Sequence, residues 1–228
     1  MKKMAAKLLE ELNVDTAFTI PVFGGIEIAE SVVITWVVMA VMVLLALWLT
    51  HGMKVHNPSR KQVAAESIVR WLESFVGGML GENAQEYVPW MATILVFIGI
   101  ANISGVFGVK PPTKDMNVTI ALALTSIVLI EAAGIRRKKV GGWLKSFAEP
   151  IAIVTPINIL EIAIRPLSLC MRLFGNVLGA FVIMELIKLV IPVGVPAIFS
   201  LYFDFFDGLI QAYVFVFLTS LFVAEAVE

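Results

Sequence analysis

A series of long apolar runs constrains the fold of this chain more than any other feature. The first run, residues 31–50, contains no charged side chain, and several later runs are about as long or longer. About 20 helical residues cross a hydrocarbon layer of about 30 Å, because a helix rises 1.5 Å per residue. Strands of a membrane barrel would alternate apolar and polar residues, and these runs do not alternate. The expected fold class is therefore an all-α integral membrane protein.

Composition agrees with that class and excludes several functions. The chain is 59% hydrophobic and has a mean hydropathy of +0.92, well above what a soluble domain of this size needs. A net charge of −1 argues against a nucleic-acid partner. The single cysteine, Cys170, excludes an internal disulfide and is interpreted as a packing residue. His51 and His56 are interpreted as solvated rather than as metal ligands, and we expect no cofactor or metal.

Five spans and one surface helix are expected within a single membrane domain. Apolar and charged residues repeat on opposite sides of a helix in the surface segment, which favours the membrane interface. The last two runs are longer than the bilayer is thick, so these helices must tilt strongly or protrude. The expected segments are the outer N-terminal segment 1–28, the spans 29–50, 87–109, 116–135, 155–191 and 196–225, and the interfacial helix 60–82.

Loop charge predicts the orientation in the membrane. Lys and Arg concentrate in cytoplasmic loops, and basic clusters follow the first span, within residues 54–70, and the third, within 136–145. Both clusters face the cytoplasm if the N-terminus lies outside and the C-terminus inside. The basic N-terminus and the acidic C-terminal tail argue against this orientation. The N-terminus also lacks the apolar core and cleavage site of a signal peptide.

A polar stripe interrupts the fourth span. Because a helix advances about 100° per residue, one face carries Arg165, Ser168, Arg172, Asn176 and Gly179. A charge at the bilayer centre costs about 2.5–3.5 kcal/mol on insertion scales, so such residues usually face a cavity or a partner and mark an ion pathway. Gly175 and Gly179 would let another helix approach Arg172. The alternatives are plain helix packing for the glycines and an arginine that snorkels from a helix end, which suits Arg165 better than Arg172.

The fifth span carries a second stripe. Asp204, Asp207 with Gly208, and Gln211 recur at helical spacing amid large apolar side chains. Buried carboxylates without partners take up protons, because desolvation disfavours the charged form. An arginine on one helix and carboxyl and amide groups on the next are the ingredients of a proton or cation path.

The motifs PPTKDMNVTIALAL, RPLSLCMRLFGN and IQAYVF, in this order and at these distances, resemble subunit a of the F-type ATP synthase. The resemblance covers nearly the whole chain. It implies a multi-pass stator subunit of the bacterial cell (inner) membrane, one copy per ATP synthase complex, next to the c-subunit ring and the b subunits of the peripheral stalk, in contact with membrane lipid. Such a subunit is no enzyme by itself and conducts ions for ATP synthesis only together with the c ring.

The resemblance assigns roles to residues that match its motifs. Arg172 matches the essential arginine that separates two aqueous half-channels and attracts the ionised carboxylate of each passing c subunit. Asn176 matches its polar neighbour, Gln211 matches the glutamine that packs opposite the arginine, and Asn102 resembles a polar residue of the outer half-channel. Three small residues beside the arginine are expected to face the c ring: Ser168, Gly175 and Gly179.

The chain also departs from the family pattern. Many relatives carry glutamate or histidine nine residues after the arginine, where this chain has Phe181. The next carboxylate, Glu185, lies about 140° around the helix from Arg172, so it would line a path behind the stripe. Asp204 stands where relatives have histidine or glutamate, seven residues before the glutamine. We expect Asp204, Asp207 and Glu185 in the outer half-channel and Glu161 in the inner one. Glu131 is interpreted as a snorkelling side chain, with a minor role in the inner path as the alternative.

Other functions and the choice of ion stay open at this level. A free-standing ion channel or secondary cation transporter could use the same stripe, although no internal repeat suggests a transporter built from inverted halves. A non-conducting assembly scaffold is a third possibility. Whether the ion is a proton or sodium should depend mainly on the c subunit, which is another chain.

Overall fold

The computed structural model describes residues 16–21, 26–147, 153, 155–191 and 194–228. Five helical segments in this part of the chain are long and apolar enough to cross a membrane, which confirms the all-α membrane class. The expected outer segment 1–28 falls partly outside the described residues. These five segments comprise Glu30–Thr50, Glu82–Phe107, Met116–Ser146, Thr155–Val190 and Ile198–Val227.

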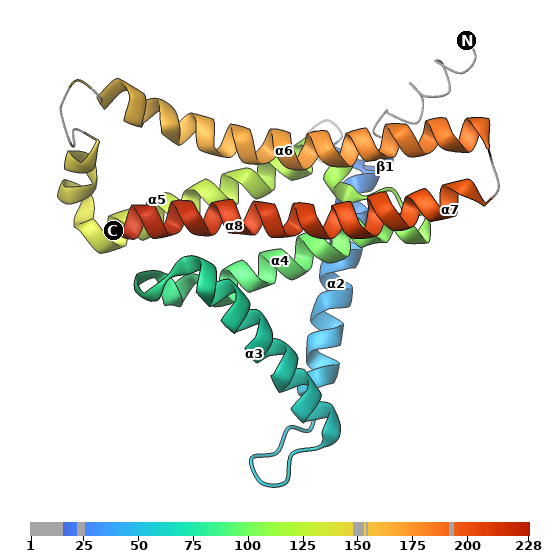
Figure 1. The fold of residues 1–228 in the computed structure, drawn as a ribbon, viewed down its shortest axis with the longest axis horizontal. Coiled ribbons are helices and arrows are strands. Elements are labelled where there is room, and N and C mark those ends of the chain that lie inside the picture. The colour runs from blue at the N-terminus through green and yellow to red at the C-terminus, as the bar shows by residue number, and fades with distance from the viewer. Residues whose placement is uncertain (1–15, 22–25, 148–152, 154, 192–193) are drawn as a thin grey trace.

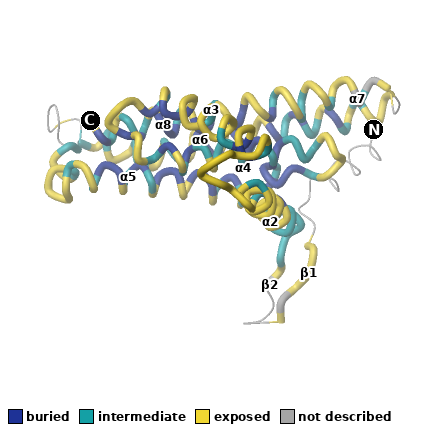
Figure 2. Tube along the Cα trace, turned by 90° about the horizontal axis from the view of Figure 1, so that it is seen from below, coloured by how far each residue is buried: buried dark blue, intermediate teal, exposed yellow. Residues whose placement is uncertain are grey.

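A small antiparallel sheet precedes the first helix, which the sequence did not lead us to expect. β1 (Thr16–Ile20) pairs with β2 (Ile26–Ala29), with Phe18 opposite Ile28. The two strands are rich in β-branched and aromatic residues, which favour a pleated, half-exposed surface. Figure 2 shows the pair projecting away from the helices. The all-α class therefore holds for the membrane part of the chain.

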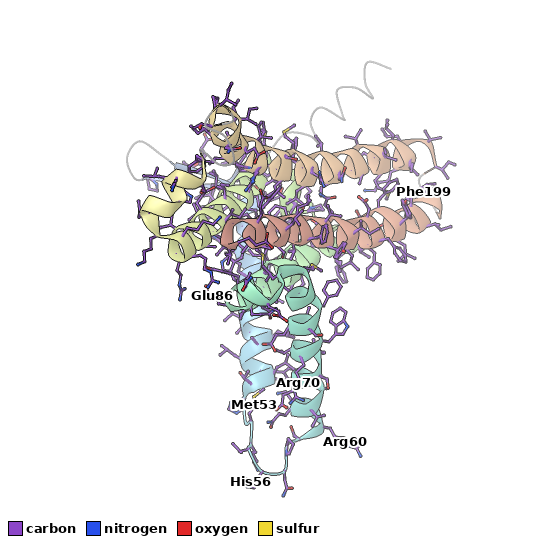
Figure 3. All side chains as sticks on the ribbon, turned by 60° about the vertical axis from the view of Figure 1, so that its left-hand side comes forward. Met53, His56, Arg60, Arg70, Glu86 and Phe199 are labelled. Carbon is purple, nitrogen blue, oxygen red and sulfur yellow. The ribbon has the colours of Figure 1, made fainter. Side chains whose placement is uncertain are left out.

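α2 (Glu30–Thr50) and α3 (Arg60–Leu80) form an arm that extends from the rest of the molecule (Figure 1). Val38 is the one buried residue of α2, so this helix offers its surface to lipid. α3 begins after Ser59, whose side chain accepts a hydrogen bond from the Gln62 backbone N–H and so caps the helix. Figure 3 shows His56 at the tip of the arm, where it is exposed.

The hairpin of the second and third spans contains several short 3₁₀ turns. One turn, Glu82–Tyr87, leads into α4 (Val88–Ile103), a second, Ser104–Phe107, follows it, and a third, Pro112–Lys114, precedes α5 (Met116–Ser146). Asp115 caps α5 by accepting a hydrogen bond from the Asn117 backbone, and it also accepts one from Ser31 of α2. α5 continues past the expected end at 135 through the basic segment, with a break at Lys139, whose φ is 59°.

The last two spans lie side by side and run across the direction of α2 (Figure 1). α6 (Thr155–Val190) has 36 residues, or about 54 Å of helix, which exceeds the hydrocarbon thickness and agrees with strong tilt. α7 (Val195–Ser200) leads through a π-helical segment, Leu201–Asp207, into α8 (Gly208–Val227). A π-helix has wider turns than an α-helix, so it rotates Asp204 relative to Gln211.

α8 is the central helix of the core, and α6 lies at its edge. α8 packs against α3, α4, α5 and α6. Among its fully buried side chains are Phe215, Val216 and Val223. α6 buries a single face, formed by Leu169, Cys170, Leu173, Val177, Ala180 and Met184. The opposite face of α6 is therefore free of the other described helices.

Candidate ion-translocation site

The polar stripe runs along an exposed side of α6, next to the side that contacts α8, and its first member, Arg165, is half-buried. Ser168, Arg172, Gly175 and Asn176 are exposed, and Gly179 is half-buried. A Cβ added to either glycine would meet no atom within 4 Å. The two glycines are therefore not explained by packing against another described helix of this chain, which was the alternative to a role in admitting a partner.

Arg172 lies near the middle of α6, between two groups of carboxylates. No described carboxylate lies within ion-pair distance of its guanidinium. By contrast, Arg165, seven residues earlier on the same side of the helix, forms ion pairs with Glu161 and Glu225. A guanidinium keeps its charge in any protein environment. Arg172 thus presents a fixed positive charge on an open surface of the described chain.

Asn176 connects the stripe to α8. Its Nδ2 donates a hydrogen bond of 2.6 Å to Oε1 of Gln211. Gln211 is 2% exposed, and α8 holds it one turn beyond Asp207. The structure therefore brings together the two amides that the sequence singled out on separate spans.

Asn102 is held in a buried hydrogen-bond network between α4 and α8. Its Nδ2 donates to the Gly208 carbonyl over 2.9 Å, and its Oδ1 accepts from the Thr113 hydroxyl over 2.6 Å. A Cβ on Gly208 would lie 2.8 Å from the Asn102 Cβ, so this close approach requires glycine. The sequence reasoning missed Thr113, because a threonine in a proline-rich turn carries no signal of a partner on α4.

A cavity of about 330 Å³ opens at one end of α6. It lies between the turn that joins α4 to α5, the α6 segment around Glu185, and the π-helical segment. Asp204 accepts a hydrogen bond of 2.6 Å from Ser200, and Glu185 forms an ion pair of 2.7 Å with Lys188. The structure thus brings Asp204 and Glu185 to one cavity.

A much smaller cavity of about 20 Å³ lies next to the first, with room for about one water molecule. Asp207 and Asn102 line it, and Asp204 lines both cavities. Asp207 therefore does not share the larger cavity with Glu185, although the sequence grouped them.

A third cavity, of about 310 Å³, lies at the opposite end of α6. Its lining includes Glu161, Arg165 and Glu225, and Arg165 bridges the two carboxylates with N–O distances of 2.9 Å and 3.0 Å. Arg165 is 18% exposed at its side chain and ties α6 to α8, so it does more than snorkel from a helix end. Glu131 also lines this cavity and accepts a hydrogen bond of 2.8 Å from Trp143.

Glu225 was missed as a site residue because it stands in what reads as an acidic tail. A signal was present, however. Glu225 follows Gln211 by 14 residues, which places it about 40° from Gln211 around a helix. A carboxylate close to the face that carries Gln211 could have been added to the stripe of the fifth span.

Comparison with known proteins shows the family of this chain. The family model described as the ATP synthase A chain matches residues 32–224. The chain belongs to the ATP synthase subunit a family. As a member of this family, it is a multi-pass, ion-translocating and non-catalytic subunit of an ATP synthase in a bacterial membrane.

Individual relatives match along most of their length. The "ATP synthase subunit a 2" of a Bradyrhizobium species is 34% identical over 209 residues, covering 90% of this chain and 91% of that protein. The "ATP synthase subunit a" of Moorella thermoacetica is 33% identical, covering 90% and 94%. The "ATP synthase subunit a, sodium ion specific" of Propionigenium modestum is 32% identical, covering 89% and 75%.

Proposed function

We propose that this chain is the stator that couples ion translocation to rotation of a c ring for ATP synthesis, with Arg172 between two aqueous half-channels. The observation that carries the proposal is the placement of carboxylate-lined cavities at both ends of α6. Arg172 follows Arg165 by seven residues and precedes Phe181 by nine, or about 10 Å and about 13 Å of helix. Neither cavity includes Arg172 in its lining.

The outer half-channel is assigned to Asp204, Asp207, Glu185 and Asn102, and the inner one to Glu161. An ion pair of 3.8 Å joins Lys110, at the Asp204 cavity, to Glu30 at the start of α2. Lys138, from the basic segment of α5, lines the Glu161 cavity. Because basic segments favour the cytoplasm, this arrangement supports an outer N-terminus, a cytoplasmic C-terminus and an outward-facing Asp204 cavity.

Arg172 supplies the asymmetry that rotation needs. A c-subunit carboxyl group, neutral in lipid, is favoured to ionise near a guanidinium. It releases its ion into one half-channel and reloads from the other, on the far side of Arg172. The membrane potential contributes about 2.3 kcal/mol per charge per 100 mV. Ser168, Gly175 and Gly179 give the c ring a surface with small side chains, and Asn176 and Gln211 hold α6 and α8 together behind it.

The b subunits of the peripheral stalk and membrane lipid are the remaining proposed partners, with one copy of this chain per complex. The exposed apolar surface of α2 suits either of them. The coupling ion is a proton or sodium. The Propionigenium relative is named as sodium-specific. Sodium is therefore one of the two coupling ions to be tested for this chain.

The test uses the whole complex in membrane vesicles. Arg172→Ala is expected to abolish ATP-driven ion uptake, whereas Lys54→Gln, in the exposed arm, leaves it unchanged. Uptake that survives Arg172→Ala would instead indicate an assembly scaffold. Ion flux through the purified chain alone in liposomes would indicate a free-standing channel or secondary transporter. ATP hydrolysis with and without sodium across a range of pH identifies the coupling ion.

A further inference from the structure

Phe181 borders both the large outer cavity and the small cavity beside Asp207. It belongs to the lining of both, together with Pro111 and Asp204. The large cavity, about 330 Å³, has room for several water molecules, whereas the small one, about 20 Å³, has room for about one. The open space therefore becomes much smaller from the cavity that Asp204 shares with Glu185 to the one that it shares with Asp207, and Phe181 borders both.

Lys114 contacts the Phe181 ring. Its Nζ lies 3.5 Å from the centroid of the Phe181 ring, within the range of a cation–π contact. Lys114 stands between two anchored residues: Thr113 donates its buried hydrogen bond to Asn102, and Asp115 caps α5. The turn that presents the ammonium group is thus fixed to α4 and α5, while the ring belongs to α6.

We propose that Phe181, held by Lys114, is the gate of the outer half-channel and admits to Asp207 nothing larger than about one water molecule. The proposal rests on the proposed function, because it presumes that ions reach Asp207 from the Asp204 cavity. Asp204 faces both cavities. A proton can therefore pass from outer water to Asp204, then to the water beside Asp207, and then to Asp207, with the ring in place. A hydrated metal cation needs the ring to move.

Cysteine accessibility tests the gate without depending on transport. Asp204→Cys and Asp207→Cys are made separately in the whole complex, in membrane vesicles whose outer face is exposed to a trimethylammonium methanethiosulfonate reagent. Labelling of this chain is followed by mass. The unmodified chain supplies the blank, because its one cysteine, Cys170, is buried. ATP hydrolysis shows that each complex has assembled.

The expected pattern separates the two positions. Asp204→Cys is labelled whether or not Phe181 is present, because it lines the open cavity. Asp207→Cys resists the reagent with Phe181 in place, and Phe181→Ala or Phe181→Leu raises its labelling rate to that of Asp204→Cys. Lys114→Gln raises the labelling rate of Asp207→Cys in part. Lys114→Arg keeps the positive charge and so leaves Asp207→Cys protected from the reagent. Ile183→Ala, an exposed apolar position on α6, changes nothing.

Each contrary outcome has its own meaning. If Asp204→Cys is unreactive in every background, the outer half-channel itself is wrong, and the proposed function fails at that point. If Asp204→Cys reacts and Asp207→Cys reacts equally with Phe181 in place, the gate is wrong. The gate is also wrong if Asp207→Cys stays protected in both the Phe181→Ala and the Phe181→Leu backgrounds. Another group would then block access to the small cavity beside Asp207.

Discussion

The amide of Asn176 on α6 lies 2.6 Å from the amide oxygen of Gln211 on α8. Nε2 of Gln211 is buried and has no hydrogen-bond partner among the described residues. The hydrogen bond from Asn176 therefore satisfies the amide oxygen of Gln211 and leaves its amide nitrogen without a partner among the described residues. This hydrogen bond joins α6 to α8 four residues after Arg172, and the ion pair between Arg165 and Glu225 joins them seven residues before it.

Asn176→Ala should destabilise the complex through Gln211. The substitution leaves a buried amide unpaired, at a cost of about 1–3 kcal/mol. We expect ATP-driven ion uptake to be lost at a lower temperature on heating. Asn176→Ala with Gln211→Leu should recover thermal stability, because no polar partner is then stranded. Asn83→Ala, at an exposed position, is the control. If the double variant loses as much thermal stability as the separate Asn176→Ala and Gln211→Leu variants together, this explanation is contradicted.

Gly208→Ala should separate α8 from α4. The added Cβ would lie 2.8 Å from the Asn102 Cβ, well inside the separation of about 3.5–4.0 Å that carbon atoms favour. Overpacking of this kind costs about 1–3 kcal/mol and also strains the hydrogen bond from Asn102 to the Gly208 carbonyl. The measurement is the thermal inactivation of ATP-driven uptake.

Gly78→Ala is the matched control for this substitution. Gly78 lies within α3, and a Cβ there would meet no atom within 4 Å. Alanine is favoured over glycine by about 0.5–1 kcal/mol inside a helix, so this variant should be as stable as the original or more so. Equal effects of Gly78→Ala and Gly208→Ala would argue against the close approach of Asn102.

Charge reversal should reveal the ion pair between Arg165 and Glu225. Arg165→Glu places a third carboxylate beside Glu161 and Glu225 and should reduce uptake and thermal stability. Adding Glu225→Arg restores an opposite pair across α6 and α8 and should recover much of both. Glu225→Gln alone should cost about 0.2–1 kcal/mol at most, because its side chain is 58% exposed and such pairs are screened. A swap that rescues nothing would show that the pair does not join the helices.

The spans and the polar stripe were predictable because each depends on the sequence of a single helix and not on its neighbours. Apolar length alone predicts where α2 and α6 lie, and a rotation of 100° per residue places Arg172 and Asn176 on one face. Neither inference needs to know which helix is the neighbour. The exposed face of α6 is consistent with that reading.

The contacts around Asn102 and Asp204 were not predictable in this way. Thr113 and Gly208 acquire their meaning from Asn102, and Gly208 is 106 residues from Asn102 along the chain. The π-helical segment Leu201–Asp207 changes the register between Asp204 and Gln211, and its aromatic sequence gives no periodic signal of that change. Contacts between distant segments and local changes in helical pitch are set by packing, which hydropathy patterns do not record.

Gly175→Leu should stop rotation if a c-subunit helix passes the stripe. A Cβ at Gly175 would have no atom of another described helix within 4 Å, so the substitution creates no close contact with these helices at the Cβ. We therefore expect normal amounts of the chain in the membrane, but loss of most ATP-driven ion uptake and of the ATP hydrolysis coupled to it. Gly78→Leu, equally open but on α3, adds the same side chain away from the stripe and should leave both activities intact. Full activity of Gly175→Leu would mean that this face meets only lipid, and the c ring would have to bind elsewhere.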